Sequence, residues 1–396
     1  MTARRADAVR IAVAVALFVA AWALLHVGFY ERDQIVDTPV YEEYGTAVEH
    51  GQVPYRDFGV EYPPGALPVF VVPALLDGDY RANFEWLMLL CGVATVVGVG
   101  LAARPLGLGL PTLAFVALAP LALGSVILTR FDLWPAALTA LALASLVHAR
   151  LRLGHALLGA AIAAKLYPGV LLPLALAYAY RRGGRREAVV CAALAVAVVV
   201  AVYLPFLLVA PDGVAASLGR QLGRPLQIES LGASLLLVAH HLFGVDVEMR
   251  SSHGSQNLFG PGAVPLAIAF SLAQVGVVAL LWWRFARGEA TPARLAGHAA
   301  AVLAAFVALG KVLSPQFLIW LIPVVPLARK VFATGLLAAS LVMTQLWFPF
   351  RYWDLVRELD EAISWLVLAR NLVLVALLLV LVDAVLSRRG REPSRS

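Results

Sequence analysis

Long apolar runs alternate with short polar or basic connectors along the whole chain. The first run follows Arg4, Arg5 and Arg10 and extends over about 20 residues, which is enough to cross the hydrocarbon core of a bilayer. No small-residue cleavage site follows this run, so we expect an uncleaved first helix. Similar runs continue to the basic tail, without a fixed-period repeat or a low-complexity linker. The pattern predicts an all-α, polytopic membrane protein that forms a single domain over residues 1–396.

The basic residues lie mainly in the short connectors between the apolar runs. Cytosolic loops of membrane proteins are enriched in lysine and arginine. If these connectors and the N-terminus are cytosolic, the chain forms six out-and-back hairpins, or about 12 transmembrane helices, with both termini inside. The connectors contain Arg104, Arg150 and Arg152, residues 181–186, Arg284, Arg287 and Arg294, Arg329 and Lys330, and the tail S-R-R-G-R-E.

The acidic residues have the opposite distribution. Under this topology the only cytosolic ones among the 25 are Asp7, Glu187, Glu289, Asp383 and Glu392. The positive-inside rule does not depend on acids, so this bias is independent information. It predicts a polar, outward-facing site at the plasma membrane, built around a first outer loop at 31–82 and a second at 211–261. The first of these carries Glu31, Asp33, Asp37, Glu42, Glu43, Glu49, Asp57 and Glu61.

The composition supports a membrane protein and excludes several other classes. The chain is 61% hydrophobic and only 14% charged, and its net charge of +6 comes from membrane flanks, so nucleic-acid binding is not expected. Cys91 and Cys191 each lie in an apolar run and predict neither a disulfide nor a thiolate site. No histidine or carboxylate pair has metal-ligand spacing, and no phosphate-binding glycine loop is present, so we expect no metal and no other cofactor.

Several apolar runs are interrupted or short. Residues 66–76 contain two prolines and predict a short outward or re-entrant helix. Residues 154–180 contain Lys165 and Pro168, which predict a tight outward turn between two short helices. A lysine at that depth needs a partner or a water-filled cavity, because an unpaired charge costs about 2.5–3.5 kcal/mol or more. The apolar piece 231–243 is interpreted as a partly embedded outward helix.

The first outer loop combines carboxylates with aromatic and turn residues. Asp37 and Tyr41 are four residues apart and would share one face of a short helix. Aromatic rings beside carboxylates suit sugars, because rings stack on C–H faces while carboxylates bind hydroxyls. The alternative interpretation is an interfacial aromatic belt with a solvated acidic loop.

An ordered series of motifs resembles a known group of enzymes. The series is D-x-x-x-Y, G-x-x-P-Y-R-D-F and E-Y-P-P-G in residues 37–65, then R-F-D (130–132), K-L-Y-P (165–168), R-P-L-Q-I-E-S (224–230) and K-V-L-S-P-Q-F (311–317). It is similar to the polyprenyl-phosphate-sugar-dependent glycosyltransferases of the GT-C superfamily, above all glycosyltransferase family 87, the actinobacterial α-mannosyltransferase group. The resemblance covers most of the chain.

This resemblance implies a catalytic mechanism and roles for individual residues. An enzyme of this kind moves a sugar from a lipid phosphate to an acceptor glycan or glycolipid outside the cytosol, with inversion. By its place in D-x-x-x-Y, Asp37 is the expected general base, with Asp33, Asp57 and Glu61 as alternatives. The leaving phosphate calls for cations, for which the candidates are Lys165, Lys311, Arg130, Arg220 and Arg224. Candidate substrate contacts are Tyr41, Tyr55, Tyr62, Asp132, Tyr167, Gln227, Glu229, Ser314 and Gln316.

Some alternatives stay open at this stage. Lys165 could instead form a structural ion pair with Asp132. Arg370, inside the last span, could pair with a carboxylate or hold the carrier phosphate. A secondary transporter or flippase is the main rival function, because broken helices and intramembrane charges also mark transport pathways. A non-enzymatic lipid-binding scaffold is a third possibility. Besides the donor, the acceptor and membrane lipids, no partner is indicated, and the oligomeric state is open.

Overall fold

The computed structural model describes residues 3–31 and 35–387 and is mostly helical. Five helical stretches are long and apolar enough to cross a membrane: Arg5–Leu24, Tyr80–Ala103, Tyr167–Val209, Ala263–Ala286 and Glu361–Leu386. They correspond to α1 (Ala3–Leu24), α4 (Tyr80–Ala103), η3 (Tyr167–Leu171) with α9 (Leu172–Val209), α12 (Ala263–Ala286) and α17 (Glu361–Leu386). The chain is therefore a multi-pass membrane protein.

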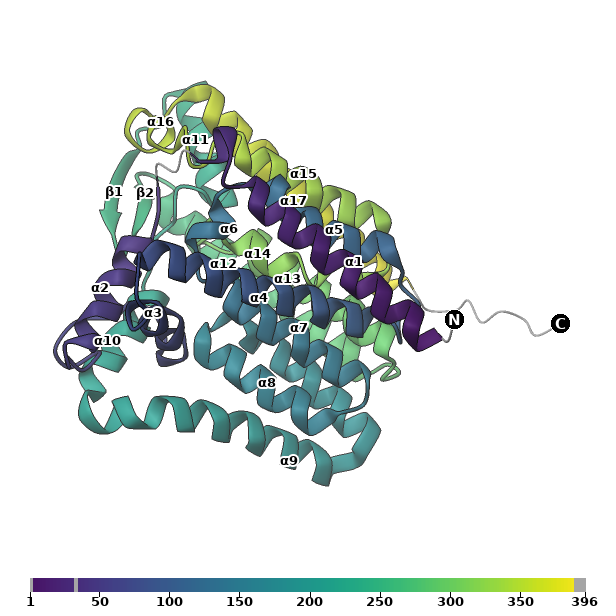
Figure 1. Cartoon of the computed structure of the whole chain (residues 1–396). Helices are drawn as coiled ribbons and strands as arrows, with labels where there is room; N and C mark the ends of the chain where they lie inside the picture. The colour runs from purple at the N-terminus through teal and green to yellow at the C-terminus, as the bar shows by residue number, and fades with distance from the viewer. Residues whose placement is uncertain (1–2, 32–34, 388–396) are drawn as a thin grey trace.

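The helix α9 contains a break at the place where the basic connector 181–186 predicts a turn. Gly184 has φ 75° and ψ −176°, a conformation outside the helical region that glycine adopts without a steric penalty. In Figure 1 the chain doubles back near the lower right corner, within the stretch labelled α9. The stretch Tyr167–Val209 thus consists of two helical segments that meet at Gly184.

Other apolar helices are shorter than a full span. A helix of 14 residues rises about 21 Å, less than the hydrocarbon thickness of about 30 Å. The helix α8, for example, ends at Ala164, with Lys165 as its C-cap residue and Pro168 shortly after it. This group comprises α3 (Leu67–Ala74), α5 (Leu110–Leu123), α7 (Leu133–Val147), α8 (Leu151–Ala164), α13 (Pro292–Ala308), α14 (Phe317–Leu321), α15 (Val331–Gln345) and the short pieces η1 (Gly28–Glu31), η2 (Pro64–Ala66), α6 (Val126–Thr129) and η4 (Val325–Ala328).

The polar elements gather at one end of the helices, opposite the end where α1 begins (Figure 1). We call this end the outer face. It carries the polar helices α2 (Thr38–Glu49), α10 (Pro211–Leu222) and α16 (Tyr352–Glu358), the strands β1 (Glu248–Ser252) and β2 (Ser255–Phe259), and the apolar helix α11 (Leu231–Phe243). The helix α11 has the bounds predicted for the embedded piece 231–243.

The strands β1 and β2 correct the all-α expectation. They pair antiparallel, with Glu248 opposite Phe259 and Ser252 opposite Ser255. The two turn residues, His253 and Gly254, both have positive φ, at 55° and 67°. Two such residues form the primed turn that matches the twist of a hairpin, and glycine favours it. The second outer loop therefore contains a β-hairpin.

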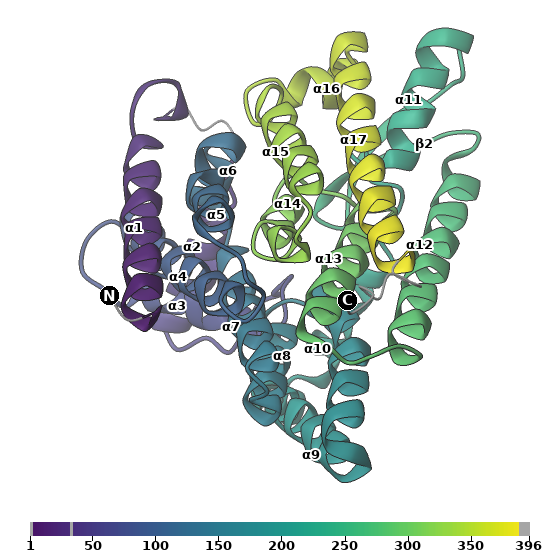
Figure 2. The same cartoon turned by 90° about the vertical axis from the view of Figure 1, so that its right-hand side faces the viewer.

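The helices pack in a continuous series that places the ends of three of them together. The helix α4 packs on α7, α7 on α8 and α8 on α9, while α13 packs on α17 and α17 on α15. Seen from the end where α1 begins, α1, α4 and α5 lie on one side, α12, α13 and α17 on the other, and α8 and α9 below them (Figure 2). Arg130 precedes α7, Lys165 follows α8 and Lys311 follows α13, so all three are presented at the outer face.

Candidate functional site

A cavity of about 680 Å³ lies at the outer face. Its volume is in the range of pockets that hold small molecules. Segments far apart in the sequence contribute to its walls, including the start of α2, the loop before η2, the end of α8, the hairpin turn and the chain that follows α13. The predicted residues that line it are Asp37, Glu61, Tyr62, Arg130, Lys165, Tyr167, Arg224, Gln227, Glu229, Lys311, Ser314 and Gln316.

Asp37 lies at the start of α2 and is held by an ion pair and a hydrogen bond. Its Oδ1 is 3.1 Å from Nη1 of Arg130, and the Tyr41 hydroxyl donates to its Oδ2 at 3.3 Å. The Asp37 side chain is 29% exposed, whereas that of Arg130 is only 4% exposed. Tyr41 is itself fixed by stacking on Phe70 at 4.5 Å between ring centroids. The carboxylate is therefore oriented from behind and still reaches the cavity.

Lys165 forms the ion pair with Asp132 that was open as an alternative. Its Nζ is 2.6 Å from Asp132 Oδ1, and the Trp320 indole N–H donates to the same oxygen at 2.6 Å. Asp132 is fully buried and does not line the cavity, whereas Lys165 does. The ammonium also lies 4.5 Å from the centroid of the Phe131 ring. Asp132 thus lies behind Lys165 and has no direct access to a substrate, contrary to its predicted substrate contact.

Glu61 and Arg224 form a second buried ion pair in the cavity wall. Gln221 donates to the backbone carbonyl of Glu61 at 3.0 Å. Burial raises the pKa of Glu61, and Arg224 acts in the opposite direction. A Cβ on Gly254 would lie 2.7 Å from Oε1 of Glu61, so the hairpin turn is in close contact with this carboxylate. The turn therefore closes one side of the cavity.

Glu229 is the most deeply buried carboxyl group of the cavity. Its carboxyl accepts from Gln227 Nε2, which also reaches Ser314 Oγ at 2.8 Å. Its backbone carbonyl accepts from Arg370 at 3.1 Å and from Asn371 at 3.2 Å. Burial raises the pKa of Glu229 to about 8, so at neutral pH this group is mostly protonated and can donate a hydrogen bond. Arg370 accordingly holds the loop that carries Glu229.

The hairpin positions this loop through the backbone. Ile228 N–H donates to the carbonyl of Gln256 at 3.0 Å, and Leu258 N–H donates to that of Leu226 at 2.8 Å. Gln227 N–H donates to the carbonyl of Lys311 at 3.0 Å. Residues 226–228 thus extend the hairpin as a short third edge and link it to the segment after α13.

Lys311 differs from the other cations that line the cavity. Arg130, Lys165 and Arg224 each have a carboxylate partner. Within residues 3–31 and 35–387, Lys311 has no carboxylate within ion-pair distance, and its Nζ has only a long contact of 3.4 Å to the carbonyl of Leu222. Its charge is therefore available to an anionic ligand.

Several predicted residues lie elsewhere. Asp33 is outside the described residues. Asp57 is bound to Arg56 at 2.8 Å and to the backbone of Val53, and the Arg56 hydrogen bond lowers the pKa of Asp57 to about 2. It does not line the cavity, nor do the remaining three predicted residues, Tyr41, Tyr55 and Arg220. Tyr55 is buried, with its hydroxyl donating to the carbonyl of Tyr62 at 2.6 Å.

Other lining residues were not identified from the sequence. Trp320 stacks on Tyr167 at 4.1 Å and on Phe317 at 4.0 Å, so both faces of its ring are covered. Tyr352 and Trp353 of α16 form another part of the wall. The aromatic run F-P-F-R-Y-W at 348–353 was recognised only as part of the outer face, and this run was the signal available for these residues.

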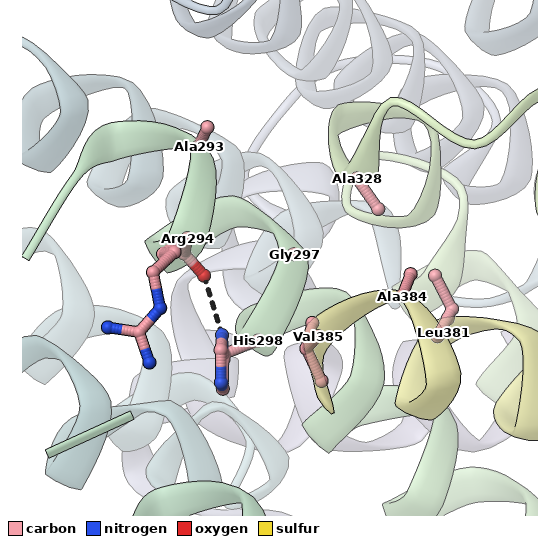
Figure 3. A pocket seen from close by; sticks show the side chains of 8 residues that line it. All are labelled: Ala293, Arg294, Gly297, His298, Ala328, Leu381, Ala384 and Val385. Atoms are coloured by element: carbon pink, nitrogen blue, oxygen red, sulfur yellow. Dashed lines mark hydrogen bonds between the residues drawn. The ribbon is translucent and has the colours of Figure 1, made fainter. Parts of the chain in front are cut away.

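A second, much smaller hollow lies between α13 and α17 (Figure 3). Its volume is about 10 Å³, close to that of a single water probe. His298 is fully buried beside it, and its Nδ1 lies 2.9 Å from the carbonyl oxygen of Arg294. This hollow is a gap in helix packing. Among the described residues, no group of three histidine, cysteine or acidic side chains is arranged to hold a metal ion.

Comparison with known proteins gives one positive result. Residues 61–315, more than half of the chain, match the family model described as Glycosyltransferase family 87. No curated protein matches the sequence. The matched segment includes Glu61, Arg130, Lys165, Glu229 and Lys311, while Asp37 lies before it.

Proposed function

Because the chain belongs to glycosyltransferase family 87, we propose that this membrane glycosyltransferase moves a hexose or pentose, with mannose as the first candidate, from a polyprenyl-phosphate carrier. The acceptor is a glycan or glycolipid of the cell envelope on the non-cytosolic side. The family assignment decides against the transporter and flippase hypotheses and against an inert scaffold. We further propose that the chain belongs to the actinobacterial mannosyltransferase subgroup of this family.

One observation supports this reaction above all others. Asp37 and four cations, Arg130, Lys165, Arg224 and Lys311, line the same cavity. A sugar transfer from a lipid phosphate needs a group that accepts a proton and groups that stabilise the phosphate as its charge grows. Groups of both kinds line this one cavity, which supports the proposed reaction.

The proposed step is an inverting displacement. Asp37 takes the proton of the acceptor hydroxyl as the oxygen forms a bond to the anomeric carbon. The bond between that carbon and the phosphate oxygen breaks, and its electron pair leaves with the phosphate. Arg130 and Tyr41 orient the carboxylate, while Lys311, Lys165 and Arg224 face the phosphate. A general base contributes about 10²–10⁴-fold, so orientation and charge stabilisation supply the rest.

We also propose how the protein is oriented in the plasma membrane: the outer face is non-cytosolic and both termini are cytosolic. About 12 spans cross the bilayer. Support comes from the basic connectors and from the break at Gly184, which allows the stretch Tyr167–Val209 to cross twice. On this arrangement the shorter apolar helices pair with the five long ones to complete the bundle.

Asp37→Asn tests the proposed base. We expect the rate of sugar transfer to fall by about 10²–10⁴-fold, because the amide keeps the shape but accepts no proton at neutral pH. The measurement is transfer from radiolabelled polyprenyl-phosphate-mannose in membranes that contain equal amounts of each variant. Asp57→Asn is the matched control, since Asp57 is an exposed carboxylate paired with Arg56 outside the cavity. Full activity of Asp37→Asn would reject Asp37 as the base.

A further inference from the structure

The cavity has two walls of different chemistry. One wall, which we call the cationic wall, carries Lys165, Arg224 and Lys311, which follow α8, α10 and α13 respectively. The other, which we call the aromatic wall, carries Phe348, Tyr352 and Trp353. In Figure 1, α10 lies at the lower end of the outer face and α16 at its upper end. A ligand that fills the cavity therefore meets three cations at one end, where Tyr167 and Trp320 also line the cavity, and the uncharged rings of Tyr352 and Trp353 at the end formed by α16.

The rings of the aromatic wall pack against one another and against a buried ring behind them. Tyr352 packs edge-on against Phe348 at 5.3 Å and against Trp353 at 5.4 Å between ring centroids. It stacks behind these on Trp347 at 6.2 Å, and the Trp347 ring is fully buried. The ion pair of Arg351 with Asp354 at 3.0 Å lies within the first turn of the short helix that carries Tyr352 and Trp353. The packing on Trp347 and Phe348 restricts the Tyr352 ring before a ligand binds, which lowers the entropic cost of binding.

This wall has the two features that bind a sugar ring. Trp353 is 36% exposed, and the Arg357 guanidinium lies 4.4 Å from its ring centroid, while the ring also contributes to the cavity. The Tyr352 hydroxyl has no hydrogen-bond partner within the described part of the chain. Burial raises the pKa of Tyr352, so this hydroxyl keeps its proton and can donate to a ligand. Ring faces accept sugar C–H groups, and a free hydroxyl binds a sugar hydroxyl.

The aromatic wall shares its cavity with the proposed base. Asp37 lines the same cavity as Tyr352 and Trp353, together with Arg130 and Glu229. An acceptor hydroxyl must lie within about 2.6–3.2 Å of the base that deprotonates it. A sugar resting on Trp353 and Tyr352 would therefore present its hydroxyls toward Asp37, while the donor phosphate occupies the cationic wall.

We propose that Tyr352 and Trp353 form the acceptor subsite and bind a glycoside whose free hydroxyl faces Asp37. This inference rests on the proposed function for the identity of the reaction. It assigns the acceptor, a neutral carbohydrate, to the aromatic wall and the anionic donor to the cationic wall. The sugar is taken to be uncharged because the two side chains of α16 that line the cavity, Tyr352 and Trp353, carry no charge.

The first experiment is a kinetic comparison of Trp353→Ala, Tyr352→Phe and the control Trp86→Ala. Trp86 is a tryptophan of α4 that is 66% exposed and lies outside the cavity wall. The donor is polyprenyl-phosphate-mannose, and the acceptors are octyl glycosides of mannose, glucose, galactose and arabinose. We expect Trp353→Ala to raise the acceptor KM about tenfold, which corresponds to about 1.4 kcal/mol for the loss of one stacking contact, with a donor KM within about twofold. A rise in donor KM instead, or no change in either, would overturn the assignment.

The second experiment does not require turnover. A diazirine-bearing octyl mannoside is photolysed with the full-length protein in lipid, and the modified peptides are identified by mass spectrometry. We expect adducts on residues 348–357 that octyl mannoside suppresses and polyprenyl phosphate alone does not. Adducts confined to the segments of Lys165 and Lys311, or none that octyl mannoside suppresses, would refute the acceptor subsite. Specific labelling without sugar transfer by the native protein would instead count against the proposed function alone.

Discussion

Asp132→Asn probes the ion pair that supports Lys165 without touching a residue of the cavity wall. Asp132 is fully buried, and its Oδ1 lies 2.6 Å from Lys165 Nζ and 2.6 Å from Trp320 Nε1. At an effective dielectric constant of about 20, two unit charges at this distance attract by about 6 kcal/mol. Desolvation offsets part of this attraction, and removing one partner of a buried pair typically costs about 3–5 kcal/mol. Asparagine keeps the shape and a hydrogen-bond acceptor but removes the charge.

The expected consequence is a change in pH dependence together with a loss of rate. Lys165 lies in the break between α8 and η3, where burial lowers its pKa and Asp132 opposes that effect. Without Asp132 the ammonium loses its proton more easily, so the activity that depends on Lys165⁺ is lost at a lower pH on the alkaline side. By analogy with the removal of one donor from a charge-stabilising site, we expect kcat at neutral pH to fall by about 10²–10³-fold.

The assay is transfer of radiolabelled mannose from its polyprenyl phosphate, with kcat measured across the pH range for four proteins: native, Asp132→Asn, Lys165→Met and the double variant. If Asp132 acts through Lys165, the double variant loses no more activity than Lys165→Met alone. A pH profile of Asp132→Asn that superimposes on the native one would refute the reasoning, as would losses that multiply in the double variant. Thermal melting in detergent controls for the loss of fold.

Four further outcomes follow from the cavity and its surroundings. Lys311→Met should raise the donor KM or lower kcat by about tenfold or more, because it removes an unpaired cation that faces the phosphate. Lys330→Met is the control, and unchanged kinetics of Lys311→Met would exclude Lys311 from the phosphate site. Glu229→Gln should make the stability of the protein fall less steeply as the pH rises. A carboxyl whose pKa is raised to about 8 stabilises the fold fully below its unfolded pKa and loses that contribution as the pH rises through about 8. Melting curves of both proteins from pH 4 to pH 9 measure this decline, and equal slopes would contradict the prediction. Gly254→Ala should destabilise the protein by about 1–3 kcal/mol, because Gly254 has a positive φ and a Cβ there would lie 2.7 Å from Glu61 Oε1. Gly276→Ala is the control, because a Cβ at that position meets open space. Equal melting temperatures of the two variants would argue against the tight turn. A cysteine at the exposed position Glu43 should react with an impermeant thiol reagent added to intact cells, while one at Arg185 should not, and the reverse labelling would invert the topology.

Local patterns in the sequence predicted the parts of the site that depend on neighbouring residues. The spacing of Asp37 and Tyr41 gave a contact that the structure contains, because a helical turn brings positions i and i+4 together. The proline after Lys165 predicted the break between α8 and η3 for a similarly local reason. Lysine and arginine positions predicted the turn at Gly184.

Other features depend on contacts between distant segments and could not be read from local patterns. Trp320 lies in an apolar run, so its sequence context does not distinguish it from a lipid-facing or core tryptophan. Its role depends on the packing of α14 against the start of α7, which brings the Trp320 N–H to Asp132. Asp132 looked equally able to face a substrate, and only the packing of α7 against α8 shows that it is buried behind Lys165. The hairpin strands E-M-R-S-S and S-Q-N-L-F lack a clear apolar alternation, so the usual strand signal was absent.

The backbone link between residues 226–228, the hairpin and Lys311 affects how such enzymes can be recombined. If the second outer loop alone were exchanged, residues 226–228 of the foreign loop would have to pair with the native carbonyl of Lys311. The foreign sequence need not keep the register of that pairing. Chimaeras designed to transplant acceptor preference should therefore carry the hairpin, residues 226–228 and the segment 310–317 together as one cassette.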